Sequence, residues 1–184
     1  MKLCFMFGHA DAPDSIMPRL NEAIENCYSK GITCFYVGNR GRFDSLATAA
    51  VSRAKMRHND IKLFLLLAYH PAERPVDLWG GFDGSYYPPL EGTPRQYTIA
   101  KANRYMVNTA DAIICYVCHV GNTRNLLEYA QRRKKDGVHI ENVAENCSCF
   151  FGCCFYYQCG LVFLPGAKGL LPLKQLPLSC PLFE

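Results

Sequence analysis

The chain has 184 residues, of which 49% are hydrophobic and 20% are charged, and its formal net charge is +4. This length favours a single domain of ordinary size, and this composition excludes an intrinsically disordered chain. A charge of +4 permits an anionic ligand without requiring nucleic acid. The opening stretch MKLCFMFGHADAPD turns polar after seven residues, so we expect no secretory signal peptide and a cytoplasmic protein.

The first third of the chain alternates between short apolar runs and amphipathic segments. Strands are predicted at residues 2–8, 33–38 and 61–69, and helices at residues 15–31 and 44–58. The third of these strands is apolar on both faces. Strands of this kind are typical of a parallel sheet that is covered by helices.

Residues 70–93 interrupt the alternation with four prolines and four glycines, and we predict a long loop there. The pattern then resumes with a helix at 94–110, a strand at 111–119, a helix at 123–137 and a strand at 138–145. This alternation predicts an α/β fold, a Rossmann-like, open, parallel, five-stranded sheet with helices on both faces. We expect the strands in the order third, second, first, fourth, fifth.

The composition changes at Cys147, after which the chain holds six of its eleven cysteines and has no charged residue before Ala167. We therefore divide the chain into a Rossmann-like domain at residues 1–146 and a Cys-rich, irregular tail at residues 147–184. The tail has three interpretations: a poorly structured or divergent appendage, a membrane-inserting segment of roughly 20 residues, or a metal site. We favour the first, because glycine, glutamine and proline dilute the apolar run and no paired Cys-x-x-Cys motifs occur.

The other five cysteines lie in apolar strand-like segments or, for one of them, on a predicted helix. Burial in such segments is typical of free thiols. The total is odd and no secretory signal is present, so we expect no disulfide framework. These cysteines are Cys4, Cys27, Cys34, Cys115 and Cys118.

Ligands of open α/β sheets bind beyond the carboxyl ends of the strands. Five segments of this chain should meet there, and each carries glycine, a cation, an amide or a hydroxyl group. They are GHAD, GNRGRFD, YHPAERP, HVGNTRN and the helix start near Pro94. This clustering is the main indication of a binding site.

The segment GNRGRFD indicates a phosphate site. Its two glycines are expected to adopt positive φ and approach a ligand closely, the following helix start offers N–H groups, and either arginine offers a guanidinium. A tight turn in which the aspartate caps the helix explains the same residues. The ligand-binding candidates here are Gly38, Asn39, Arg40, Gly41, Arg42 and Asp44.

Further candidates follow the first and fourth strands or lie on the helix before the fourth strand. They are Gly8, His9, Asn103, Arg104, Gly121, Asn122, Thr123 and Asn125. The Asn103–Arg104 pair is equally explained by an intramolecular hydrogen-bond network. His9, His70 and His119 follow strand ends, but no two of them have the spacing of a zinc protease motif, so we predict no metal and no cofactor.

Four segments resemble, in the same order, motifs of the SLOG superfamily, the Rossmann-like nucleotide-binding fold named for the SMF/DprA and LOG proteins. They are VGNRGRFDSLATAAV, YYPPLEGTPRQYTIA, ANRYMVNTADAIICYV and GNTRNLLEYAQRRKKDGVHIENV. The second resembles a loop of small stand-alone bacterial members of the YpsA-like kind. The resemblance covers residues 2–145 and implies a nucleotide-binding domain at residues 1–146, often a homodimer.

The LOG proteins of this superfamily cleave the N-glycosidic bond of nucleoside monophosphates and carry the signature P-G-G-x-G-T-x-x-E. This chain has HVGNTRNLLEYA instead. Asn122 replaces the second glycine, and Glu128 lies two residues beyond Leu126, the matching position. Pairing of Glu128 with Arg124 or Arg132 is its simpler interpretation. The resemblance therefore supports binding more than hydrolysis.

The leading hypothesis is binding or sensing of a nucleotide or nucleotide-derived ligand through phosphate-cradling strand-to-helix loops. The first alternative is a hydrolase like the nucleoside 5'-monophosphate phosphoribohydrolases, with catalytic candidates Glu128, Asp44 and Glu91. The second alternative is DprA-like binding of single-stranded DNA, for which the basic run at residues 132–135 is the one strong feature. Nucleic-acid partners and membrane contact by the tail are not favoured.

Overall fold

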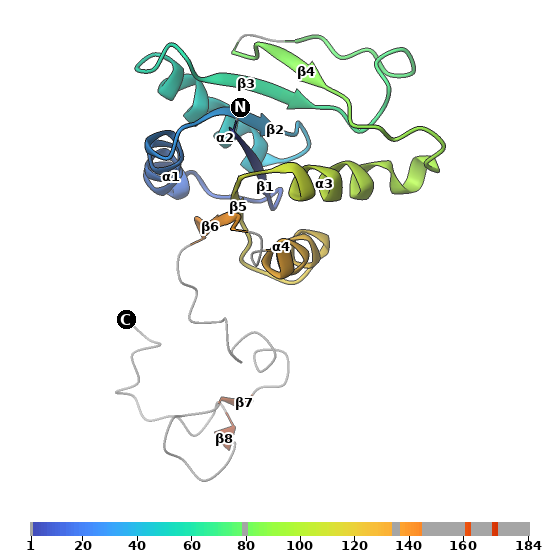
Figure 1. The fold of residues 1–184 in the computed structure, drawn as a ribbon. Helices are drawn as coiled ribbons and strands as arrows, with labels where there is room; N and C mark the ends of the chain where they lie inside the picture. Colours follow the sequence, from blue (N-terminus) through green and yellow to red (C-terminus); the bar gives the residue numbers. More distant parts are fainter. Residues whose placement is uncertain (1, 79–80, 134–136, 145–160, 163–170, 173–184) are drawn as a thin grey trace. The chain divides into compact units, whose positions relative to one another are not determined.

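The structure is a computed structural model of the chain and describes residues 2–78, 81–133, 137–144, 161–162 and 171–172 (Figure 1). The chain divides into two compact units, Met1–Ala144 and Glu145–Glu184. In the second unit the described residues form β7 (Leu161–Val162) and β8 (Leu171–Pro172), an antiparallel pair. The rest of the predicted Cys-rich tail, including its six cysteines, lies outside the described residues.

The first unit is an α/β structure built on one sheet of six strands, all paired in parallel (Figure 1). The strands lie in the order β4-β3-β2-β1-β5-β6, so the predicted order of the five expected strands is confirmed. The predicted number of strands is wrong, because a sixth strand joins the edge beside β3. The strands are β1 (Lys2–Gly8), β2 (Ile32–Val37), β3 (Lys62–Leu66), β4 (Gly84–Tyr86), β5 (Ala112–Tyr116) and β6 (His139–Asn142).

The additional strand β4 lies inside the segment 70–93 that was predicted as a loop. Asp83 fixes its start, since the carboxylate accepts a hydrogen bond from the Leu63 N–H at 2.8 Å and pairs with Lys55 at 2.6 Å. Burial alone would raise the pKa of Asp83, but these partners outweigh it and lower the pKa. The strand has only three residues, the first of which is Gly84, so no apolar alternation indicates it in the sequence.

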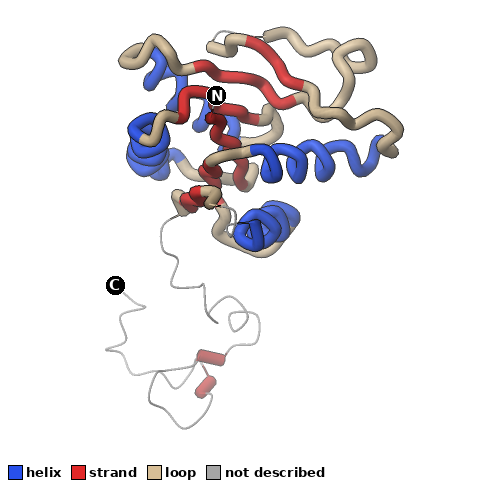
Figure 2. The backbone as a smooth tube through the Cα atoms, viewed as in Figure 1, coloured by secondary structure: helices blue, strands red, loops and turns tan. Residues whose placement is uncertain are grey.

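Four α-helices cover the two faces of the sheet. Their bounds are Met17–Ser29 for α1, Arg42–Lys55 for α2, Thr98–Thr109 for α3 and Asn122–Arg133 for α4, and short 3-10 turns η1 (Asp14–Ile16) and η2 (Arg95–Tyr97) precede α1 and α3. α1 and α2 contribute to one apolar core and α3 and α4 to another, so helices lie on both faces as predicted. Figure 2 shows these helices in blue beside the red strands.

Close packing of α2 on the sheet explains why the last residue of β1, at the carboxyl edge, is a glycine. Phe43, in the first turn of α2, is fully buried. A Cβ atom on Gly8, the last residue of β1, would lie 2.4 Å from the Phe43 ring. Gly8 was predicted as a ligand-binding residue, and its contact in the structure is with this core side chain.

Four of the five cysteines of the first unit are buried and free, as predicted. Cys118 is partly exposed, because β5 ends at Tyr116 and leaves Cys118 in the turn that follows. In the part of the chain that the structure describes, no helix combines the length and the apolar character needed to cross a membrane.

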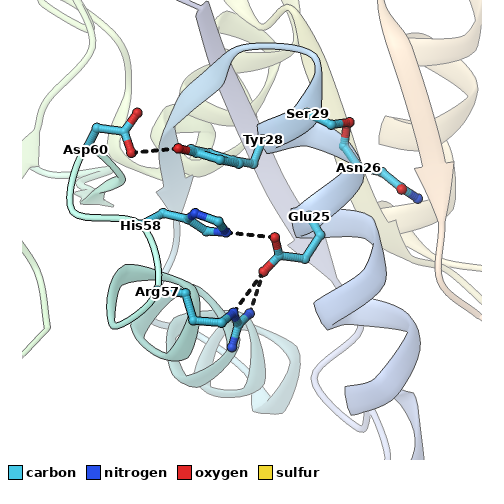
Figure 3. A network of polar contacts seen from close by, with 7 residues as sticks. All are labelled: Glu25, Asn26, Tyr28, Ser29, Arg57, His58 and Asp60. Atoms are coloured by element: carbon cyan, nitrogen blue, oxygen red, sulfur yellow. Dashed lines mark hydrogen bonds and ion pairs between the residues drawn. The ribbon is translucent and has the colours of Figure 1, made fainter.

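A polar network joins α1 to the turn after α2 (Figure 3). Glu25 accepts hydrogen bonds from Arg57 and lies 2.8 Å from His58 Nε2. Tyr28 stacks on the His58 ring with 3.9 Å between centroids and donates to Asp60 at 3.1 Å. The Arg57 and His58 hydrogen bonds lower the pKa of Glu25 below its ordinary value of 4.5.

We predict that Glu25→Gln weakens the acid dependence of stability. A carboxylate whose pKa is depressed by folding contributes stability that is complete above its unfolded pKa and is lost as the pH falls through the lower, folded pKa. The measurement is the free energy of unfolding by urea across the acid range. Glu22→Gln is the matched control, since Glu22 lies exposed on the same helix and forms no ion pair with the described residues. Identical pH profiles for the two variants would contradict the role of Glu25.

We also predict that removal of residues 147–184 leaves a folded domain. The whole six-stranded sheet and both apolar cores lie within Met1–Ala144, so the truncated chain keeps its hydrophobic driving force. Calorimetry of the truncated and full chains should show one cooperative unfolding transition for the domain in each. Loss of cooperative unfolding in the truncated chain would show that the domain boundary is wrong.

Candidate functional site

Three arginines surround one tyrosine at the carboxyl edge of the sheet. Tyr69, three residues past the end of β3, is half-buried. The guanidinium carbons of Arg40, Arg74 and Arg95 lie 5.5, 5.8 and 5.5 Å from the centroid of its ring. Arg40 comes from the turn after β2, Arg74 from the segment after β3, and Arg95 from the start of η2. The arrangement thus unites three of the five segments that were predicted to meet.

Two cavities share Tyr69 in their walls. The smaller, of about 150 Å³, is lined by Asn39, Arg40, Arg74 and the end of β3. The larger, of about 440 Å³, includes His70, Tyr87, Leu90 and Arg95 among its lining residues. Its volume falls within the range of roughly 300–1,000 Å³ that is usual for small-molecule sites. Arg40 and Arg74 therefore line one cavity, and Arg95 lines the neighbouring one together with an aromatic and aliphatic wall.

These three guanidinium groups form no ion pair with any carboxylate of the described residues. Because all three lie around one ring, they are at most about 11 Å apart. Salt with a screening length of about 8 Å therefore weakens the repulsion among their like charges without removing it. A cation on an aromatic face is favourable, by roughly 0.5–1 kcal/mol at exposed sites, but a bound anion would relieve the repulsion as well.

The predicted phosphate cradle has a different backbone conformation from the one expected. Gly38 and Gly41 do not have positive φ, so this part of the prediction is wrong; Gly41 is extended, with φ −153° and ψ 175°. Steric room explains the glycine at position 41, where a Cβ atom would lie 2.7 Å from Cα of Ala10. At position 38 a Cβ atom would lie 2.9 Å from the carboxylate of Asp44.

Asp44 turns back onto this loop and accepts a hydrogen bond from the backbone N–H of Arg40 at 2.8 Å. Burial raises the pKa of the Asp44 carboxyl, while the N–H groups of Arg40 and Gly41 oppose that rise. Part of the donor set expected for a phosphate therefore binds the protein's own carboxylate. Asp44 is not the N-cap residue of α2, which is Gly41; it lies in the first turn of the helix and binds the loop that precedes it. The Arg42 side chain does not join this loop and instead forms an ion pair with Asp14 at 2.7 Å.

Most of the other predicted residues lie away from the two cavities. Arg104 packs over the ring of Tyr129, 5.7 Å from its centroid, and Glu128 pairs with Arg124 at 3.3 Å on the surface of α4. Glu91, the third catalytic candidate, does line the larger cavity. The predicted residues that line neither cavity are Gly8, His9, Gly38, Gly41, Arg42, Asp44, Asn103, Arg104, Gly121, Asn122, Thr123, Asn125 and Glu128.

A second cluster lies where β1 and β5 end. His9 and His119 stack with 3.6 Å between ring centroids, and Cys118 lies beside them, so that one potential ligand atom from each residue lies within 4.8 Å of the others. Burial and then the charge of His119 lower the pKa of His9. The Val120 carbonyl and Asp11 raise the pKa of His119. His119 was not among the predicted ligand-binding residues.

Sequence reasoning identified the segments of the site and missed the side chains that define it. YHPAERP and the helix start near Pro94 were expected at the edge, yet Tyr69, Arg74 and Arg95 were not chosen. A signal was present, since an aromatic residue at a strand end is followed closely by an arginine. The pairing of Arg95 with Tyr69 has no sequence signal, because it depends on the path of the loop between them.

No model of a known protein family matches this chain, and no curated protein matches it significantly. The resemblance to the SLOG superfamily therefore depends on the sequence motifs alone.

We predict that Gly41→Ala destabilises the domain by about 1–3 kcal/mol, the usual range for overpacking. The added Cβ atom meets the backbone of Ala10, which cannot rotate away as a side chain could. Gly84→Ala is the matched control, since a Cβ atom there makes only ordinary contact with Phe64 at 3.5 Å. The measurement is the free energy of unfolding by urea. Equal and small losses of unfolding free energy in both variants would contradict the close approach of Gly41 to Ala10.

Proposed function

We propose that this chain binds a phosphate-bearing ligand of the nucleotide class in the cavities beside Tyr69, through Arg40, Arg74 and Arg95. The observation that carries the proposal is the convergence of three guanidinium groups on one ring, with no ion pair to a carboxylate of the described residues. The Rossmann-like strand order and the SLOG resemblance agree with this class of ligand. In the proposed site the arginines replace the backbone cradle that the sequence suggested.

Each part of the proposed site has a chemical counterpart in such a ligand. Guanidinium groups bind phosphate through two parallel N–H donors, which a lysine cannot reproduce. Tyr87 and Leu90 give the larger cavity an aromatic and aliphatic wall for the base or sugar. A phosphate would draw guanidinium groups from the Tyr69 ring and free its face for stacking.

Hydrolysis of an N-glycosidic bond is the second candidate, because Glu73 and Glu91 line the larger cavity together with Arg95. Such a reaction needs a carboxylate close to the ribose, and a sugar in the larger cavity would lie beside Glu73 and Glu91. Binding without turnover is the simpler proposal, since a nucleotide phosphate among the arginines needs no catalytic group.

We predict that Arg40→Ala, Arg74→Ala and Arg95→Ala each weaken the binding of AMP by about one to two decades. Charge-assisted hydrogen bonds contribute roughly 1.5–3 kcal/mol each, and about 1.4 kcal/mol corresponds to tenfold in affinity. Isothermal titration calorimetry with AMP, ribose 5-phosphate, adenosine and inorganic phosphate measures the effect. Adenosine should bind more weakly than AMP to the unaltered chain.

Arg42→Ala is the matched control, because it removes the same charge only two residues along the chain, and Arg42 pairs with Asp14 outside both cavities. Its AMP affinity should stay within about twofold of the unaltered chain. Arg40 is exposed, so Arg40→Ala should leave the melting temperature without ligand nearly unchanged. Equal affinities for the Arg42 and Arg40 variants would contradict the proposed site. Release of free adenine from AMP, abolished by Glu91→Gln, would instead establish the hydrolase.

A further inference from the structure

His9, Cys118 and His119 are brought together by the parallel pairing of β1 with β5. His9 directly follows β1, and the other two residues follow β5 within three positions. The His9 backbone N–H donates to the Tyr116 carbonyl at 3.0 Å, which holds the two strand ends side by side. Two imidazoles and a thiol, far apart in the sequence, thereby share one small volume.

His9 has an unsatisfied nitrogen in this cluster. The residue is 5% exposed, and its Nε2 atom has no hydrogen-bond partner among the described residues. Such atoms are rare in native proteins, because a buried polar group has lost its water and needs a replacement. An ion that accepts the nitrogen lone pair would supply that replacement.

His119 is positioned to offer its Nε2 atom. Its Nδ1 atom lies 3.2 Å from the Val120 carbonyl oxygen, a contact in which Nδ1 carries the hydrogen and the oxygen accepts. The Nε2 atom faces Asp11, with the two carboxylate oxygens 3.4 and 3.3 Å away. A backbone carbonyl on the far ring nitrogen is the usual way in which proteins orient a metal-binding histidine.

We propose that His9, Cys118 and His119 form a site for a divalent ion of the zinc class, with the Asp11 carboxylate as a fourth ligand. Imidazole and thiolate together select zinc over the hard cations calcium and magnesium, and four ligands complete its tetrahedral shell. The Cys118 thiol releases its proton to solvent when the ion binds.

Binding the ion requires a small rearrangement that the structure makes possible. Zinc bonds of 2.0–2.3 Å place neighbouring ligand atoms roughly 3–4 Å apart, so atoms up to 4.8 Å apart must move closer. The His9 and His119 rings are stacked with only 21° between their planes, and near-parallel rings cannot both direct an in-plane lone pair at one ion. The side chain of His119 is 49% exposed and can turn, while buried His9 stays in place.

The test uses the full chain with its six tail cysteines replaced by serine, because those thiols would compete for the ion. After removal of metal with a chelator, the chain is titrated with cobalt(II), whose bond to a thiolate gives an intense near-ultraviolet charge-transfer band. Zinc affinity is then measured by displacement of the cobalt. We expect one ion per chain, the thiolate band, and tighter binding of zinc than of cobalt.

Cys118→Ser should abolish the thiolate band, and both Cys118→Ser and His119→Ala should weaken zinc binding by about 100-fold or more. His139→Ala is the control, since it removes a partly exposed histidine of β6 that lies outside the cluster. Melting temperatures without metal verify that each variant is folded. Absence of the band in the parent chain, or zinc affinity unchanged by Cys118→Ser, would overturn the site.

The metal site and the proposed nucleotide site are tested separately. Zinc affinity is measured without nucleotide, and Arg40→Ala should leave it unchanged. Loss of zinc binding in Arg40→Ala would contradict the proposal that the two sites are independent. Failure of AMP to bind to the unaltered chain would contradict the nucleotide site and leave the metal result unchanged.

Discussion

Parallel pairing of β1 with the strands on both of its sides is the constraint on which the rest of this structure depends. Met6 pairs with Val37 of β2, and Gly8 pairs with Tyr116 of β5. Because all the strands of the sheet run in the same direction, the turns after β1, β2, β3 and β5 all emerge at one edge. The chain reaches β2 through α1 on one face and β5 through α3 on the other, so this edge opens on both sides of β1.

Charges at this edge are distributed unequally between its two halves. On the side of β1 and α2, three carboxylates have partners within the protein: Asp44 accepts from a loop N–H group, Asp14 pairs with Arg42, and Asp11 faces His119. On the side of β3, the guanidinium groups around Tyr69 have no ion-pair partner among the described residues. The guanidinium groups without an ion-pair partner are therefore gathered beside Tyr69, where Glu73 and Glu91 also line the larger cavity.

The two proposed ligands differ in chemistry, but each would satisfy protein groups that lack a partner among the described residues. Around Tyr69 the three guanidinium groups lack an anionic partner, which a phosphate would supply. In the His9 cluster the buried Nε2 atom of His9 lacks a partner, and a metal ion would accept its lone pair. Both groups lie where turns leave the sheet, a position at which polar side chains of neighbouring turns are held close to one another. The parallel sheet thus brings together polar groups that none of the separate turns could satisfy alone.

Periodicity was sufficient to predict the α/β class and five of the six strands, because apolar runs and amphipathic segments report burial directly. The usual topology of open α/β sheets predicted their order. The turn after β2 was also correctly placed at the edge. Its glycines were misread, since a sequence does not show whether a glycine provides positive φ or room for a neighbour such as Ala10. The three-residue strand β4 left no periodic signal.

The tertiary structure alone decided which side chains meet. Arg95 reaches Tyr69 only through the path of a long loop, and His9 reaches Cys118 and His119 only because β1 and β5 are hydrogen-bonded neighbours. Contacts of this kind join residues that are remote along the chain, so neither local propensity nor spacing encodes them. The sequence by itself therefore determined five strands of the sheet and the edge at which their turns meet, and the folded chain determined which side chains lie together at that edge.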